Sequence, residues 1–161
     1  MRTVRCQSRD EDCFYPTDRS DGNDLSMTVT YRSLTIEWLG YATVRIETAE
    51  GYVVYLDPGR YGVLEDYYAR DGDLICVTHD HHYDSGGIRH VATEDATVVA
   101  FGGIDAGGID RDVEPLEALP FEVVTVGQED RYAAAAAHVW SIPAYNDPGG
   151  PHVRADGPPY H

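Results

Sequence analysis

A short apolar run turns abruptly into imidazoles and carboxylates in the stretch Leu74-Ile75-Cys76-Val77-Thr78-His79-Asp80-His81-His82-Tyr83-Asp84-Ser85-Gly86-Gly87. The apolar part predicts a buried strand over 74–78. In extended backbone, residues two apart point the same way, so His79 and His81 can converge on one ion. His82 faces the other way unless the backbone bends, and Asp84 lies within reach of a second position. Imidazole with carboxylate suits a cation such as Zn²⁺; the alternative is a solvated polar loop that binds nothing.

Thr78-His79-Asp80-His81, directly after a strand and followed by Tyr83-Asp84, resembles the metal-binding signature of the metallo-β-lactamase-fold hydrolases. Two other segments carry the same resemblance. The first is Trp38-Leu39-Gly40-Tyr41-Ala42-Thr43, similar to the "WLGHAT" segment of the branch related to L-ascorbate-6-phosphate lactonase, and the next strand ends in Asp57-Pro58 as it does there. The second is Pro143-Ala144-Tyr145-Asn146 with Tyr160-His161, similar to a "PAYN … HP" element of that branch. The resemblance extends from Met27 to His161.

The resemblance implies an α/β (α+β) fold, the N-terminal part of an αββα metallo-β-lactamase sandwich with a mostly antiparallel or mixed sheet. The family pattern His-x-His-x-Asp-His fits this chain either with one inserted residue or with the ligands displaced by one, to His82 and Asp84. In both alignments Ser85 takes the place of the last histidine. The family's later Gly-Asp-Thr-type turn and last histidine have no counterpart after His161, so we expect residues 27–161 to form a partial, C-terminally truncated domain.

A complete domain of this kind would be a metal-dependent hydrolase, and the resemblance implies one or two ions of Zn²⁺ or Mn²⁺. The implied metal ligands are His79, His81, His82 and Asp84, with His81 and His82 as alternatives for the second position. Asp84 is also the candidate catalytic residue, because it would hold a metal or orient the water. Asp57 would orient a metal-bound histidine, unless it is only a turn residue at a strand end. Metal-activated water would attack an ester, lactone or phosphoester.

Two other functions stay open for the same fold. The chain could be a non-catalytic metal-binding or interaction module, or it could keep the fold and bind no metal. If the sheet stops before its last strands, its open edge favours formation of a homo-oligomer. An incomplete set of ligands would also leave the chain alone with little or no hydrolase turnover.

The composition is strongly acidic, with a formal net charge of −16, and all twelve basic residues are arginine. Such a surface repels nucleic acid and anionic membrane, so we expect neither as a partner and expect a small-molecule substrate instead. Abundant Asp and Glu without Lys indicate a protein of halophilic archaeal character that works in a high-salt cytoplasm. The alternative is ordinary acidity combined with an arginine-biased composition.

No apolar run approaches the ~18 residues of a membrane span and no signal-type segment follows the N-terminus, so we expect a cytoplasmic protein. Residues 1–26 are rich in Arg, Asp, Ser and Gly, which predicts a disordered leader and makes Met27 a candidate true start. Cys76 is expected to be a small core residue. Cys6 and Cys13 make a poor zinc site and suggest no disulfide framework.

From Met27 onward the sequence predicts successive strands and one short helix. The expected strands cover 34–38, 42–48, 52–56, 74–78, 97–101, 121–126 and 138–142. The other expected elements are a short helix over 88–93 with Ser85 or Gly86 near its N-terminus, a helical turn within 61–70 and a loop over 143–161. Residues 133–137 are all alanine and favour helix by propensity, but five residues cannot nucleate a helix alone.

We predict that folding depends on the salt concentration. Self-repulsion of the −16 charge destabilises the compact chain in dilute buffer, and molar salt shortens the screening length to about 3 Å. Circular dichroism across a KCl series from dilute to molar should therefore show β structure that increases with salt. A chain that is fully folded and unfolds cooperatively in dilute buffer would contradict this prediction.

Overall fold

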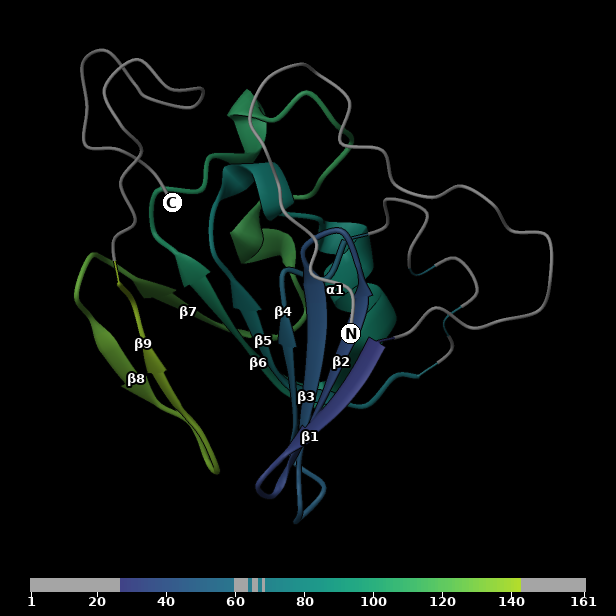
Figure 1. The fold of residues 1–161 in the computed structure, drawn as a ribbon. Coiled ribbons are helices and arrows are strands. Elements are labelled where there is room, and N and C mark those ends of the chain that lie inside the picture. Colours follow the sequence, from purple (N-terminus) through teal and green to yellow (C-terminus); the bar gives the residue numbers. More distant parts are fainter. Residues whose placement is uncertain (1–26, 60–63, 65–66, 68, 143–161) are drawn as a thin grey trace, which may run out of the picture.

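The computed structural model describes residues 27–59, 64, 67 and 69–142. These residues form a seven-stranded sheet and a separate two-stranded hairpin (Figure 1). The strands of the sheet lie side by side in chain order: β1 (Met27–Tyr31), β2 (Leu34–Gly40), β3 (Thr43–Thr48), β4 (Val53–Leu56), β5 (Gly72–Val77), β6 (Ala92–Phe101) and β7 (Glu122–Val126). The hairpin consists of β8 (Arg131–Ala133) and β9 (His138–Trp140).

The sheet is mixed, as the sequence predicts. β1 to β4 pair antiparallel in a meander, and β4 to β7 pair parallel. Parallel neighbours need a crossover connection, and α1 (Ser85–Val91) supplies it between β5 and β6. This mixed sheet with few helices is consistent with the N-terminal part of a metallo-β-lactamase fold, and the predicted fold class is confirmed.

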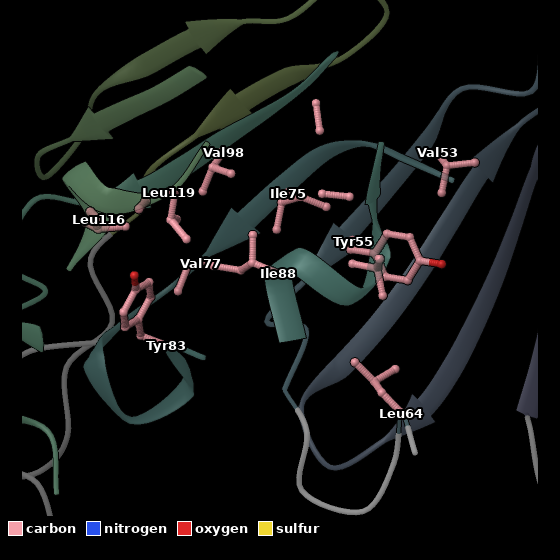
Figure 2. Close-up of a cluster of buried hydrophobic side chains, with 14 residues drawn as sticks. Val53, Tyr55, Leu64, Ile75, Val77, Tyr83, Ile88, Val98, Leu116 and Leu119 are labelled. Carbon is pink, nitrogen blue, oxygen red and sulfur yellow. The ribbon is translucent and has the colours of Figure 1, made fainter. Parts of the chain in front are cut away.

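The larger hydrophobic core lies between α1 and one face of the sheet. Ile88 and Val91 of α1 are fully buried there, against apolar side chains of the central parallel strands. Figure 2 shows Ile88 close to Ile75 and Val77 of β5, with Tyr83 from the segment before the helix. Each fully buried aliphatic side chain of this kind contributes about 1.5–3 kcal/mol of transfer free energy.

A smaller core lies on the opposite face of the sheet. Leu74, Val99 and Val126 are buried there, and side chains of the β8–β9 hairpin pack against them, including Tyr132 and Val139. The hairpin lies on the β7 side of the sheet (Figure 1). It therefore covers the parallel half of this face.

The first turn of α1 packs tightly on the turn that follows β4. A Cβ atom at Gly87 would lie 2.2 Å from the carbonyl oxygen of Pro58, a separation that no side chain allows. Asp84 begins the helix, because its side chain accepts a hydrogen bond of 2.9 Å from the backbone N–H of Gly87. The helix thus begins three residues before the predicted 88–93 and ends at Val91, since the backbone from Ala92 onward pairs in β6.

Other elements differ from their predictions or lie outside the described residues. Residues 133–137 form no helix: Ala133 ends β8, and the amide of Ala134 bonds to the carbonyl of Ala137 at 2.8 Å across the hairpin. β1 was not among the predicted strands, although its apolar and polar residues alternate as in a strand. The leader over 1–26, most of the helical turn within 61–70 and the loop over 143–161 lie outside the described residues.

Candidate functional site

The three histidines of the predicted site lie at the carboxyl end of β5. His79 precedes a 3-10 turn, Asp80–His82, which bends the backbone at this point. The bend brings the ring of His82 next to that of His79, with 4.2 Å between the ring centroids, while His81 lies 5.4 Å from His79. The strict alternation that would separate His79 from His82 therefore does not hold, and all three imidazoles come together.

Asp57 is only 7% exposed, and its carboxylate accepts the hydrogen bonds that hold the loop with the histidines in place. It accepts hydrogen bonds of 2.8 Å from both the backbone N–H and the hydroxyl of Thr78. Its Oδ2 also lies 3.0 Å from Nδ1 of His82. One buried side chain at the end of β4 thus connects the end of β5 with the histidine turn.

These bonds assign the tautomers of two histidines. The single hydroxyl proton of Thr78 is donated to Asp57, so its oxygen can only accept from Nδ1–H of His79, 2.9 Å away. Nδ1 of His82 likewise donates its proton to the ionised carboxylate of Asp57. In both rings Nε2 is then the nitrogen that carries the electron pair, which is the form in which imidazole binds a metal.

The structure places Asp84 after the histidine turn, where one carboxylate oxygen caps α1 through Gly87. Ser85, which aligns with the last histidine of the family pattern, is 4% exposed and accepts a hydrogen bond of 2.9 Å from the amide of Glu114. Ser85 therefore has a packing role in this chain and contributes no imidazole.

Two residues that the sequence analysis did not select also belong to this site. Tyr41, in the turn between β2 and β3, holds its ring edge-on to His82 with 5.5 Å between the centroids. The sequence does contain a signal for Tyr41, because this residue takes the place of the histidine in the "WLGHAT" segment. Arg111 reaches the histidine turn from a segment 28–31 residues away, and its Nη2 donates to the carbonyls of Tyr83, His81 and Asp80 at 2.9, 3.1 and 3.4 Å.

A hollow of ≈ 440 Å³ lies beside this turn and is lined by Asp84, Ser85, Gly86, Arg111, Asp112, Val113 and Glu114. Its size is within the range of small-molecule sites. Most of its charged side chains are acidic. Arg111 lines the hollow and also donates hydrogen bonds to the histidine turn. Asp84, which follows this turn in the chain, lines the hollow as well.

The donors of the histidine turn have the chemistry that a zinc-type ion requires: three adjacent imidazoles, two of them with Nε2 as the basic nitrogen. Within the described part of the chain, however, no three side chains of His, Cys, Asp or Glu converge on one point as a formed metal site. Cys76 packs against the smaller core, as the sequence predicts, and burial together with the charge of Asp57 raises the pKa of its thiol to about 12.

The comparison with protein families agrees with the observed fold. The family described as "Beta-lactamase superfamily domain" matches residues 35–160, which include β2 to β9 and the histidine turn. The chain belongs to this family. Searches of curated proteins and of solved structures find no match. Among the described residues, no helix is long and apolar enough to cross a membrane.

We predict that Asp57→Asn destabilises the folded chain by about 1–3 kcal/mol. An amide keeps the size of the carboxylate, but its NH₂ group would face the donors on Thr78 and His82. Urea unfolding at fixed salt measures the change. Asp130→Asn is the matched control, because Asp130 also accepts from a backbone amide, that of Gly127, but is exposed.

The control should lose no more than about 0.5 kcal/mol. Equal unfolding free energies for Asp57→Asn and the unmodified chain would show that the buried carboxylate does not organise the site.

Proposed function

We propose that this chain is a metal-dependent hydrolase of the metallo-β-lactamase superfamily that binds one or two Zn²⁺ or Mn²⁺ ions through His79, His81, His82 and Asp84. The observation that carries the proposal is the network around Asp57, which orients His79 and His82 with Nε2 as the basic nitrogen. A buried carboxylate behind the imidazoles is the usual support of a metal-binding histidine. A solvated polar loop that binds nothing would not require a buried carboxylate to hold its imidazole rings.

The residues would divide the chemistry as follows. A bound ion lowers the pKa of its water towards about 7 and so supplies hydroxide at neutral pH. Asp57 holds the rings and their tautomers, through Thr78 for His79 and directly for His82. Asp84 lines the adjoining hollow, where its carboxylate would orient the attacking water.

The charges beside the site favour an uncharged substrate group. Among the described residues that line the hollow, Arg111 is the one cation, against the three carboxylates of Asp84, Asp112 and Glu114. The net charge of −16 adds long-range repulsion of anions. We therefore expect a neutral ester or lactone to be attacked more readily than a phosphoester.

A second candidate function is a metal-binding module of the same fold without catalysis. It is favoured by the observation that no three donors in the described residues already converge on one point. An ion held by fewer or more loosely placed donors would leave its water poorly positioned, and a misplacement of about 1 Å can cost 10²-fold in rate.

We predict that the chain retains about one Zn²⁺ or Mn²⁺ per molecule and that His79→Ala/His82→Ala abolishes this binding, because both oriented imidazoles are removed. Metal analysis after dialysis measures the content. His138→Ala is the matched control: His138 is an exposed histidine in β9, on the hairpin. Equal metal content in the unmodified chain and the double variant would refute the proposed site.

Turnover tests the first candidate function. Ester, lactone and phosphodiester substrates are assayed with added Zn²⁺ or Mn²⁺, with the double variant as the blank. Metal-dependent turnover that the variant lacks supports the hydrolase. Binding of metal at these histidines without turnover of any substrate class agrees both with the metal-binding module and with a hydrolase whose set of ligands is incomplete.

A further inference from the structure

The last carbonyls of the histidine turn lie beyond the backbone bonds that close it. In Asp80–His82 these closing bonds are each 3.2 Å long, and their acceptors are the carbonyls of His79 and Asp80. The carbonyls of His81 and Tyr83 come after these acceptors, and the last carbonyls of a helical turn find no amide within the turn itself. The bent form therefore needs a donor from another part of the chain.

Arg111 supplies this donor. Its Nη2 lies 2.9 Å from the carbonyl oxygen of Tyr83, 3.1 Å from that of His81 and 3.4 Å from that of Asp80. Carbonyl dipoles that point to one place repel one another unless a cation lies between them. The guanidinium is always protonated, so it places a permanent positive charge where the carbonyl end of a helical turn favours one.

The chain around Arg111 is anchored, so the guanidinium is held at the turn. Three residues further on, the amide of Glu114 donates to the hydroxyl of Ser85 at 2.9 Å, and the carbonyl of Glu114 accepts from the hydroxyl of Tyr83 at 2.6 Å. The amide of Val113 bonds to the carbonyl of Arg111 at 3.0 Å, and the Val113 side chain packs against the larger core. The segment that carries Arg111 is thus fixed to the start of α1 by contacts that do not involve the guanidinium.

The bend of the turn gathers the imidazoles. In extended backbone, His79 and His82 would point to opposite sides, whereas the turn brings their rings to 4.2 Å between centroids. We propose that Arg111 is a positioning residue: it holds the histidine turn in its bent form and thereby sets the affinity of the turn for a divalent cation such as Zn²⁺. The dependence of the affinity rests on the proposed metal-binding function, whereas the positioning of the turn does not.

The sign of the change in affinity separates positioning from simple electrostatics. A guanidinium repels a divalent cation, so if charge alone acted, loss of Arg111 would lower the Kd for Zn²⁺. If Arg111 holds the turn, its loss separates the imidazoles and raises the Kd. In 1 M KCl the screening length is about 3 Å, and the repulsion is largely removed. Measurements in 1 M KCl therefore report the effect of positioning.

Titration of the full chain with Zn²⁺ in 1 M KCl, against a competing chelator, tests the proposal. We expect Arg111→Ala to raise the Kd about tenfold, as is typical when a group behind the ligands is lost. We expect Arg111→Lys to recover part of the affinity, because an ammonium keeps the charge and can donate to the same carbonyls but lacks the planar fork of the guanidinium.

Arg89→Ala is the matched control, because it removes the same charge from the chain. The hydrogen bonds of Arg89 go to Glu114 and to the carbonyl of Ala118, on the neighbouring segment. The control should lower the melting temperature and leave the Kd unchanged. A Kd that is unchanged or lower in Arg111→Ala, equal rises in the Arg89 and Arg111 variants, or no recovery with Lys would each overturn the proposal.

Two measurements on the metal-free chain test the positioning role without Zn²⁺. The amides of His82 and Tyr83 close the turn, so their hydrogen exchange reports how often the turn opens. We expect several-fold faster exchange in Arg111→Ala than in Arg89→Ala. The nuclear Overhauser contact between the rings of His79 and His82 should be present in the unmodified chain and in the control, and weakened in Arg111→Ala.

These measurements keep the positioning role and the metal site distinguishable. If the unmodified chain binds no Zn²⁺ but Arg111→Ala opens the turn, the proposed metal site is refuted and the positioning role stands. If the unmodified chain binds Zn²⁺ at the histidines, but exchange and ring contact are the same in Arg111→Ala and in Arg89→Ala, the positioning role is overturned and the metal site stands.

Discussion

The buried carboxylate of Asp57 is the interaction on which the site and much of the sheet depend. A buried ionised group is costly unless hydrogen bonds compensate it, and here Thr78 and His82 supply three donors. The backbone of Asp57 adds two bonds: its amide donates to Cys76 and its carbonyl accepts from the hydroxyl of Thr43. One residue thereby fixes the relative positions of β3, β4, β5 and the histidine turn.

The conformation of Asp57 indicates how strongly its surroundings constrain it. Its φ is 45°, in the left-handed region, which costs a non-glycine residue roughly 1–3 kcal/mol. The next residues of the same turn lie against α1, where only a glycine at position 87 leaves room for the carbonyl of Pro58. The turn after β4 is therefore held on one side by hydrogen bonds to the histidine turn and on the other by close packing of the helix.

Local sequence patterns predict much of this arrangement. The run before His79 has the composition of a buried strand, and β5 forms there; β2, β3, β4 and β7 also form within two residues of their predicted bounds. The histidines were found because three imidazoles after a strand are a local signal. The helix α1 begins at Ser85, one of the two residues expected near its N-terminus, but its cap is Asp84, a residue that the sequence analysis had assigned to the metal.

The remaining features depend on contacts between distant residues, which no local pattern encodes. Arg111 contacts Tyr83 across 28 positions, and nothing in its own neighbourhood distinguishes it from the other arginines. The alanines over 133–137 favour helix, but pairing of β8 with β9 requires a turn there. The closeness of His79 to His82 likewise depends on a 3-10 turn that the alternation of an extended strand does not predict.

The charged and the apolar residues of the meander lie on its two opposite faces. The charged side chains of β2 and β3 point to the α1 side, where Arg45 bridges Glu47 and Asp71 at 2.8 and 2.7 Å. The other face exposes only uncharged groups. The carboxylate of Asp57 and the histidine turn lie at the end of the strands, and the apolar row from Val29 to Ile46 runs across their middle. These rows share no side chain with the network around Asp57, so the packing of this apolar face and the geometry of the histidine turn are physically separable.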